Sequence, residues 1–304
     1  MQPSPTMLPI TPPTALLLAA LMFCGSASAQ GLDAEDVAFL DSFMLAKYPP
    51  DGPGGVLLVA KDGLPVYRKA FGLASMELRV PNHPGNVFKI ASNTKQFTAV
   101  AVLQLAGAGA LDLDADIRTY LPEFGGDTPI TVAQLLNHTS GIPSNGQLPE
   151  MLGMDLLATS AADFVRFLGQ QSVFFTPGED FSYSNNAFDL AGVIVERVSG
   201  LSLTDYYQQR IFDPLGMRDS YTTDRKTVVP GRATGYRKVE GRDYRYVREE
   251  AEPSWSIGSG FISSTVDDLL RWNEGLLAGT VLSDAWRERA WTPTTLSDGR
   301  IPIQ

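Results

Sequence analysis

Apolar residues recur along the first part of the chain with two different spacings, and each spacing predicts a different element. Over residues 33–47 they recur every three or four positions, which predicts an amphipathic helix. Two apolar runs at 56–60 and 65–70 flank Asp62-Gly63, and this dipeptide predicts a hairpin because it suits a tight turn. The apolar positions of the predicted helix are Val37, Leu40, Phe43 and Met44.

After the hairpin, the pattern becomes mostly helical. Residues 97–106 are apolar all round, which predicts a buried helix closed by Gly107 and Gly109. A short strand pair is expected around residues 240–241. Further helices are expected at Thr131–Asn137, Ala161–Gln170, Phe188–Val198, Leu203–Arg210 and Thr265–Leu277, with capping by Ser160 with Asp163 and by Ser264 with Asp267. A strand pair followed by a helical body indicates an α+β fold with a mostly helical lobe.

The composition is that of a globular chain. Its 304 residues, 44% of them hydrophobic, are enough for one large domain or two interleaved lobes. The net charge of −10, without a clustered basic stretch, argues against binding to nucleic acid or to an anionic membrane surface. We therefore expect a small-molecule or peptide substrate as the partner, and no nucleic acid.

Residues 1–29 have the pattern of a secretory signal peptide. The apolar run 15–24 is too short to span a bilayer comfortably, and residues 27–29 form a small-x-small cleavage site before Gln30. The segment departs from the usual pattern because no Lys or Arg precedes the apolar run. We expect a periplasmic or secreted protein without a stable membrane anchor. Cleavage would also remove Cys24, the only cysteine.

A serine and a lysine stand three residues apart at the head of the buried helix. Positions i and i+3 share one face of a helix, so Ser92 and Lys95 can approach to hydrogen-bonding distance. A serine hydroxyl becomes a nucleophile when a neighbouring base takes its proton, and an amine can be that base. This spacing is common by chance. Taken alone, the pair is better explained as a helix cap and a solvated lysine.

Four further segments favour a catalytic interpretation of the Ser92–Lys95 pair. They span 130–142, 175–186, 211–217 and 258–265, and carry Asn-His-Thr-Ser-Gly, Tyr-Ser-Asn, Asp-Pro-Leu-Gly and Gly-Ser-Gly in that order. Together with the Ser-x-x-Lys pair, they resemble the serine beta-lactamase and penicillin-binding-protein superfamily over residues 35–300. The nearest branch holds the class C beta-lactamases, the D-alanyl-D-alanine carboxypeptidases and related esterases. The resemblance implies a beta-lactamase/transpeptidase-like fold, with an antiparallel sheet flanked by helices and a mostly helical lobe.

The resemblance also implies roles for four residues. Ser92 would be the nucleophile, and Lys95 the base that deprotonates it. Tyr183 would pass a proton to the leaving group, and Asn185 would orient Lys95 and bind a substrate carbonyl. The backbone N–H of Ser92 would supply half of an oxyanion hole.

Other residues of these segments have a structural interpretation. His138 is expected to hold its turn near the site, and Gly258 and Gly260 to serve tight backbone geometry. Tyr183 could be no more than a packed ring with a satisfied hydroxyl. Two histidines, with no cysteine after processing, are too few nitrogen and sulfur ligands for a zinc site. There is no G-x-S-x-G elbow and no phosphate or dinucleotide glycine loop, so we expect neither metal nor cofactor.

One element of the superfamily's site is not found. Its members carry Lys-Thr-Gly or His-x-Gly on a strand beside the nucleophile, where the cation binds a substrate carboxylate. After Gly260 no glycine stands in such a motif, and no histidine follows His138. We therefore expect residues 30–304 to be a hydrolase domain that lacks its C-terminal sheet strands. Alone, it would leave the hairpin without strand neighbours and show little or no activity.

Two functions remain as hypotheses. The first is a metal-independent serine hydrolase that forms an acyl-enzyme on Ser92 and acts on a β-lactam, a D-alanyl peptide or a small ester. The second is a periplasmic module that binds cell-wall peptides or regulates without turnover. The set of Ser92, Lys95, Tyr183 and Asn185 favours the enzyme, since a binder needs no base beside a serine. The absent third element favours the binding module.

Overall fold

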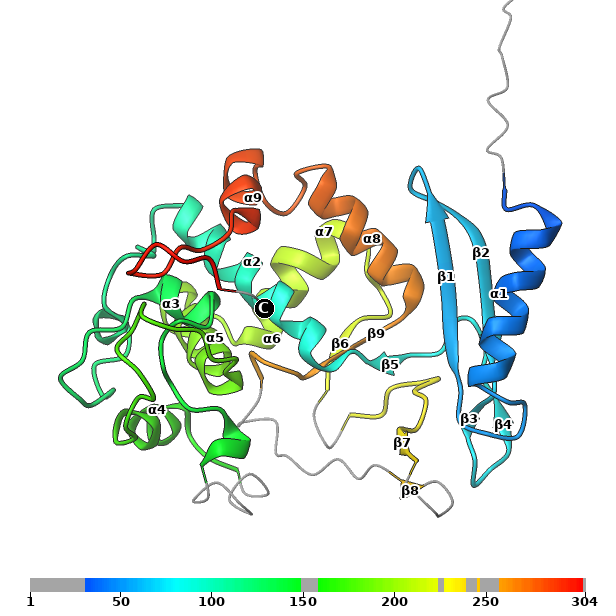
Figure 1. Cartoon of the computed structure of the whole chain (residues 1–304), viewed down its shortest axis with the longest axis horizontal. Coiled ribbons are helices and arrows are strands. Elements are labelled where there is room, and N and C mark those ends of the chain that lie inside the picture. The colour runs from blue at the N-terminus through cyan, green and yellow to red at the C-terminus, as the bar shows by residue number, and fades with distance from the viewer. Residues whose placement is uncertain (1–30, 149–157, 224–226, 239–244, 247–256, 303–304) are drawn as a thin grey trace, which may run out of the picture. The chain divides into compact units, whose positions relative to one another are not determined.

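The structure, a computed structural model, describes residues 31–148, 158–223, 227–238, 245–246 and 257–302 (Figure 1). The expected signal peptide and the turn at 240–241 lie outside the described residues. Residues Leu32–Gln304 form one unit by their contacts, and every described helix and strand lies within it.

The predicted hairpin forms. Strand β1 (Gly55–Lys61) pairs antiparallel with β2 (Leu64–Phe71). Asp62 and Gly63 connect the strands with φ of 52° and 75°, the left-handed conformation that a two-residue turn between twisted strands requires. Within the described residues, β1 and β2 pair only with each other.

Helix α1 (Ala34–Lys47) covers one side of the hairpin, and a small core fills the space between them. Met44 is buried there together with Tyr67 and Phe71. The predicted buried face is wrong for Phe43, whose side chain is 50% exposed and stacks on another exposed ring of α1. The apolar spacing therefore wrongly grouped Phe43 with the residues that pack against the hairpin.

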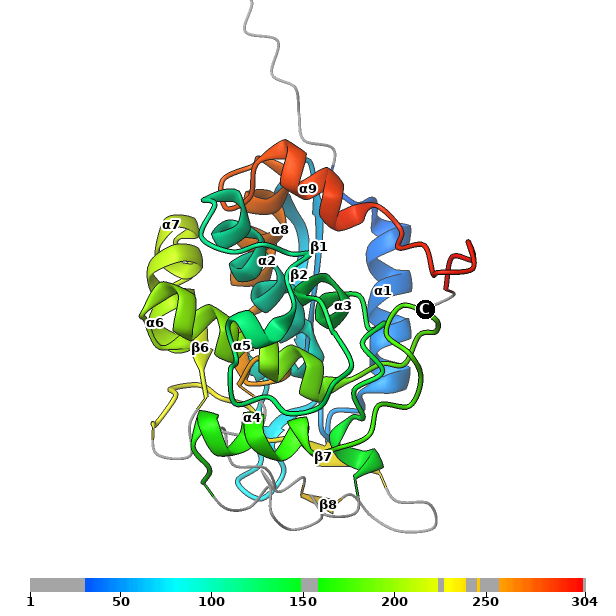
Figure 2. The same cartoon turned by 90° about the vertical axis from the view of Figure 1, so that its left-hand side faces the viewer.

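The other side of the hairpin contacts helix α8, so that the hairpin stands between α1 and α8 (Figures 1 and 2). A hydrogen bond of 2.8 Å from Arg68 Nε of β2 to Asp267 Oδ1 joins the hairpin to the first turn of α8. This ion pair links segments nearly two hundred residues apart. Packing from two helices thus supports a strand pair that would be marginal alone.

Helix α2 (Thr94–Gly107) runs through the main core, and most of its side chains are buried, as its apolar sequence predicts. It packs against α5 and α6. The other helices are α3 (Val132–Leu136), α4 (Ala161–Gly169), α5 (Asn185–Ser199), α6 (Leu203–Tyr207), α7 (Asp213–Leu215), α8 (Val266–Leu277) and α9 (Asp284–Trp291), with 3-10 turns at Ala91–Asn93, Ile117–Thr119 and Asn145–Gln147 and a π-helical turn at Gln208–Phe212.

All five further predicted helices form, and the differences lie mainly at their ends. Helix α5 begins three residues earlier than predicted, and α6 gives way to the π-helical turn before Pro214, whose ring nitrogen cannot donate a helical hydrogen bond. Helix α9 was not predicted. The cap predicted at Ser264 is wrong: Thr265 caps α8 by accepting from the N–H of Asp268 at 3.2 Å, while Ser264 belongs to a strand.

Several small antiparallel sheets complete the fold, which confirms the α+β class. They are β3 (Leu73–Ser75) with β4 (Val80–Pro81), β5 (Phe88–Lys89) with β9 (Ile262–Ser264) and β6 (Tyr221–Thr222), and β7 (Tyr236–Arg237) with β8 (Arg245–Tyr246). The last pair is the one expected around 240–241. The pairing of β5 with β9 matters most, because it brings the chain just before Ser92 beside the segment that follows Gly260.

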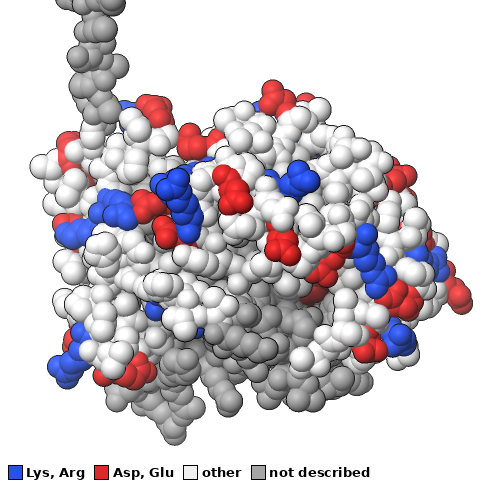
Figure 3. Space-filling view, turned by 180° about the vertical axis from the view of Figure 1, so that it is seen from behind, with Lys and Arg blue, Asp and Glu red and all other residues white. Residues whose placement is uncertain are grey.

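The described surface carries mixed charge. Figure 3 shows Lys and Arg side chains scattered among Asp and Glu across the face viewed from behind, rather than gathered in one patch. Arg68 with Asp267 and Lys69 with Asp41 are two such neighbouring pairs. Among the described helices, none has both the length and the apolar character needed to cross a membrane.

Replacing Met44 and Phe43 tests which side of α1 is buried. Met44→Ala should lower the free energy of unfolding by about 2–5 kcal/mol, because it empties part of the small core. Phe43→Ala should change it by less than about 1 kcal/mol, since half of that ring is already in water. Denaturant unfolding of both variants measures the difference. A larger loss for Phe43→Ala would contradict this packing.

Candidate active site

Ser92 lies at the exposed head of α2, in the 3-10 turn Ala91–Asn93. Ala91 has a φ of 46°, which a residue with a side chain adopts only at an energetic cost. Strand β9 holds this turn: the backbone N–H of Ile262 donates to Thr94 Oγ1 at 3.0 Å, one residue after the turn. The fold thus presents the serine on a backbone that its neighbours constrain.

Lys95 is 7% exposed, and its amine contacts three oxygen atoms. Lys95 Nζ lies 2.7 Å from Asn185 Oδ1, 2.9 Å from the backbone carbonyl of Ser259 and 3.3 Å from Ser92 Oγ. The three come from the first residue of α5, from the segment before β9 and from the 3-10 turn before α2. The sequence predicted Ser92, Lys95 and Asn185 as site residues, and the structure brings all three together.

The chemistry of these three oxygens differs. The amide oxygen of Asn185 and the carbonyl of Ser259 can only accept hydrogen bonds, so each takes one hydrogen of the amine. The remaining tetrahedral position of the nitrogen faces Ser92 Oγ. In a neutral amine that position is the lone pair, which can receive the hydroxyl proton. The two carbonyl-type acceptors therefore aim the basic position of Lys95 at the serine.

Tyr183 lies beside Lys95 and is the partly exposed aromatic residue among the four predicted site residues. Lys95 Nζ lies 4.7 Å from the centre of the Tyr183 ring, and the side chain is 44% exposed. The same ring also contacts the ring of His138, with 4.5 Å between ring centres. The structure therefore places Tyr183 next to Lys95, with its ring over the amine and much of its surface in solvent.

His138 is built into the wall behind Tyr183. Its Nδ1 accepts the backbone N–H of Ser184 at 3.1 Å, and its backbone has a φ of 60°. Burial and then the positive charge of Lys95 lower the pKa of His138 to about 4. A neutral ring that accepts at Nδ1 carries its hydrogen on Nε2. These contacts are those of a residue that positions the Tyr183–Asn185 segment, in line with its structural interpretation.

The start of α5 fixes Asn185. Ser184 caps the helix by accepting from the N–H of Ala187 at 3.2 Å. The backbone N–H of Asn185, which has no partner within its own helix, donates to Ser144 Oγ at 3.1 Å. Ser144 follows the Asn-His-Thr-Ser-Gly segment, and sequence reasoning gave it no role.

The Gly-Ser-Gly segment has a role that sequence reasoning missed. Gly258 was expected to serve close packing, and a Cβ there would lie 2.3 Å from the carbonyl oxygen of Phe188. Close packing does not require a glycine at position 260, because a Cβ there would meet nothing within 4 Å. Between them, Ser259 supplies the carbonyl that receives Lys95. No local pattern marks a backbone carbonyl, so only the folded chain shows this contact.

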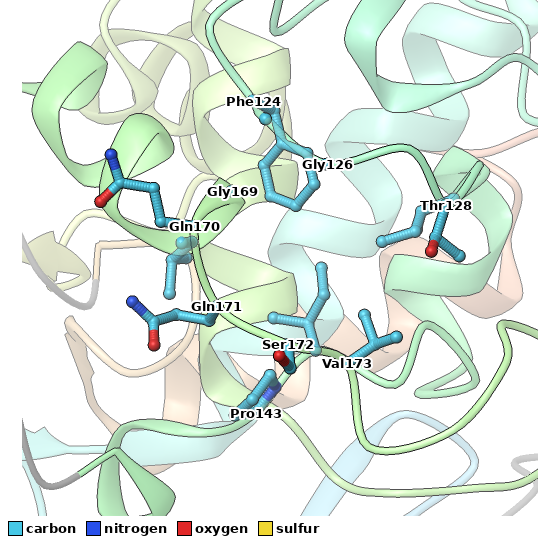
Figure 4. Close-up of a pocket in the computed structure, with 13 residues that line it drawn as sticks. Phe124, Gly126, Thr128, Pro143, Gly169, Gln170, Gln171, Ser172 and Val173 are labelled. Atoms are coloured by element: carbon cyan, nitrogen blue, oxygen red, sulfur yellow. The ribbon is translucent and has the colours of Figure 1, made fainter.

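Among the described residues no side-chain cluster suits a metal ion, and one described pocket is lined by none of the four predicted site residues. No cluster of three or more His, Cys, Asp or Glu side chains in these residues could hold a metal ion. Figure 4 shows a separate pocket of about 340 Å³, whose described lining contains no charged residue and none of the four predicted site residues. Its apolar lining residues are Phe124, Ile130, Ile142, Pro143, Leu168 and Val173.

Comparison with known proteins identifies the family. The family model described as Beta-lactamase matches residues 46–301. The chain belongs to the beta-lactamase family. This match confirms the resemblance that the Ser-x-x-Lys pair and the later segments indicated. It also supports the general class of hydrolase, without naming a substrate.

Three named proteins show which members of the family this chain is similar to. Penicillin-binding protein 4* of Bacillus subtilis is 30% identical over 259 residues, covering 81% of this chain and 57% of that protein. A D-aminopeptidase of Gluconobacter oxydans is 29% identical, and the match covers 85% of this chain and 48% of the aminopeptidase. The solved structure of a D-stereospecific amidohydrolase from Streptomyces sp. has a TM-score of 0.68 and 28% identity, covering 81% of this chain and 74% of that one. The chain spans about half the length of the curated relatives it matches.

The buried imidazole of His138 should make stability depend on pH. The unfolded chain takes up a proton on this histidine below about pH 6.5, whereas the folded protein does so only near a pKa of about 4. Stability should therefore fall as pH drops from about 6.5 to 4, by about 3 kcal/mol from this group. Denaturant unfolding of the wild type and of a His138 variant across that range measures this contribution as a difference, since the raised pKa of Asp189 affects both proteins alike.

The chain offers a matched control, because its other histidine, His83, is exposed. As the pH falls from 6.5 to 4, the stability of His138→Gln relative to the wild type should rise by about 3 kcal/mol, because only the wild type carries the buried imidazole. The stability of His83→Gln relative to the wild type should show no such rise. An equal slope in the wild type and in His138→Gln would show that His138 titrates as it does in the unfolded chain.

Proposed function

We propose that this protein is a serine hydrolase that forms an acyl-enzyme on Ser92, with Lys95 as the base, and acts on amides or peptides of D-amino acids. The observation that carries the proposal is the arrangement of the Lys95 amine. Its Nζ lies 3.3 Å from Ser92 Oγ, while Asn185 Oδ1 and the Ser259 carbonyl occupy its two other directions. That geometry suits proton transfer from serine to lysine.

Acylation then proceeds in two steps. Neutral Lys95 takes the hydroxyl proton as Ser92 Oγ bonds to the substrate carbonyl carbon, which gives a tetrahedral oxyanion and a lysine cation. The backbone N–H of Ser92 would stabilise that oxyanion. The carbon–nitrogen bond then breaks, the leaving amine receives the proton, and Lys95 is neutral again. Water attacks the resulting ester in the same way and regenerates Ser92.

Tyr183 is the proposed carrier of the proton to the leaving group. Its ring lies next to the Lys95 amine, and its exposure lets a substrate reach it. His138 and Phe181 support this part of the chain, with 5.8 Å between their ring centres. Asn185 would keep its bond to Lys95 and offer its side-chain N–H₂ to a substrate carbonyl.

The choice of substrate rests on the named relatives. A D-aminopeptidase and a D-stereospecific amidohydrolase both act, by their names, on D-configured residues. Penicillin-binding protein 4* adds a protein named for a β-lactam ligand. Among a β-lactam, a D-alanyl peptide and a small ester, this set favours the D-configured amide. Export through residues 1–29 to the periplasm or the medium is part of the same proposal.

Covalent labelling tests the nucleophile and the base. Labelling needs the nucleophile and its base but no turnover, so it can be observed even at the low activity expected for residues 30–304 alone. A fluorophosphonate probe should modify wild-type protein at Ser92, detected by intact mass and peptide mapping, and Ser92→Ala should not be labelled. Lys95→Ala should be labelled about a hundredfold to ten-thousandfold more slowly, because the serine loses its base. Lys61→Ala, on the exposed tip of the hairpin, is the matched control and should react like the wild type.

Labelling that persists in Ser92→Ala would remove the proposed nucleophile. Saturable binding of a D-alanyl peptide by the wild type without any adduct would favour the non-catalytic binding module instead.

Enantiomeric substrates test the substrate class. D-alanine p-nitroanilide should be hydrolysed at least about tenfold faster, by kcat/KM, than its L enantiomer, because one pocket cannot place both side chains equally well. A penicillin and p-nitrophenyl acetate serve as the competing substrates in the same assay. Preference for the ester, or no enantiomeric preference, would overturn the D-configured amide as the substrate.

A further inference from the structure

One fully enclosed carboxyl group lies close to the catalytic lysine without touching it. Asp189 is on α5, four residues after Asn185 and so on the same face of the helix, and it is 2% exposed. Its Oδ1 accepts the backbone N–H of Gly258 at 3.2 Å, and its Oδ2 lies 3.1 Å from Ser259 Oγ. Both partners belong to the turn whose carbonyl receives Lys95.

The same turn is held from the opposite side. Thr98 Oγ1, one helical turn after Lys95 on α2, donates to the Gly258 carbonyl at 2.5 Å and lies 2.6 Å from the hydroxyl of Tyr207 on α6. Helices α2 and α5 therefore both bond the Gly258–Ser259 turn, and α6 supports it through the Thr98 hydroxyl. Of these contacts, the one of Asp189 Oδ2 acts on Ser259 itself, through its hydroxyl, while Asp189 Oδ1 and Thr98 hold the N–H and the carbonyl of Gly258.

We propose that Asp189 is a positioning residue, which fixes the Ser259 carbonyl and through it aims the basic position of Lys95 at Ser92. Without Asp189 the Ser259 carbonyl would be held less firmly, because only Thr98 would still bond the turn at Gly258, and the amine would keep Asn185 Oδ1 as its better-fixed acceptor. One acceptor leaves the amine free to rotate about that bond, whereas two acceptors define the third direction. This inference rests on the proposed acylation of Ser92.

The charge of Asp189 fits this role. Burial raises the pKa of Asp189 to about 8, although the hydrogen bonds from Ser259 and Gly258 and the positive charge of Lys95 lower it. At neutral pH the group is therefore mostly an uncharged acid. An uncharged group can hold the turn through hydrogen bonds alone, without placing a buried negative charge near Lys95. Asparagine offers a neutral planar group of the same shape, with an oxygen for the Gly258 N–H.

The experiment measures the limiting rate of Ser92 labelling by a fluorophosphonate, with the probe concentration at half-saturation determined separately. Asp189→Leu and Asp189→Ser both remove the planar group, one with an apolar and one with a polar side chain. Each should lower the limiting rate about tenfold to a hundredfold, with half-saturation unchanged, while Asp189→Asn should stay within about threefold of the wild type. Rates are expressed per folded molecule, from near-ultraviolet circular dichroism.

A matched control separates positioning from stability. Asp268 on α8 is also fully buried and bonds Ser220 Oγ at 2.9 Å, but it has no link to Lys95 among the described contacts. Asp268→Leu should destabilise the fold yet keep the wild-type labelling rate per folded molecule. A wild-type rate in Asp189→Leu and Asp189→Ser, or an Asp189→Asn rate as low as theirs, would overturn the proposal.

A second readout needs no catalysis. Reductive methylation with formaldehyde and borohydride, read for each lysine by peptide mass, reports how firmly the Lys95 amine is held. Lys95 should be modified severalfold faster in Asp189→Leu and Asp189→Ser than in the wild type or Asp189→Asn. If the wild type is not labelled at Ser92, the proposed function fails, while unchanged Lys95 methylation in the variants refutes the positioning role by itself.

Discussion

A lysine amine inside a protein needs hydrogen-bond acceptors in fixed places, and that requirement governs this site. An amine taken out of water and left without partners would cost several kcal/mol. Lys95 meets the requirement with Asn185 Oδ1, the Ser259 carbonyl and Ser92 Oγ. Two of these oxygens can only accept, so the need to satisfy a buried nitrogen also sets the direction of its reactive position.

The rest of the fold can be understood as the means of bringing those acceptors together. Helix α5 contributes Asn185 at its first residue and Asp189 one turn later, so that one rigid element sets both an acceptor of Lys95 and the group that holds the Ser259 turn. Gly258 allows the turn to pass against α5, where any side chain would meet the Phe188 carbonyl. The packing of α2 against α5 sets the distance between Lys95 on α2 and Asn185 on α5.

The other catalytic candidate, Tyr183, is placed differently. It lies on the solvent side of the amine, with its ring against His138 and 44% of its surface exposed. Buried groups thus hold the proposed base, Lys95, while Tyr183, proposed to meet the leaving amine, stays accessible to a substrate. This division between a rigid base and an open proton carrier agrees with membership of a hydrolase family.

The sequence by itself determined the local features: the hairpin at Asp62-Gly63, the buried helix after Ser92 and the approach of Lys95 to that serine. Period, turn chemistry and i, i+3 spacing act over a few residues, so they can be read directly from the chain. The approach of Asn185 was predicted only through resemblance to a family. Tertiary structure alone decided that the Ser259 carbonyl accepts from Lys95, that Phe43 is exposed and that Asp189 bonds the Gly258–Ser259 turn. Lys95 meets its two carbonyl-type acceptors across 90 and 164 residues of chain, and no local pattern records contacts at that separation.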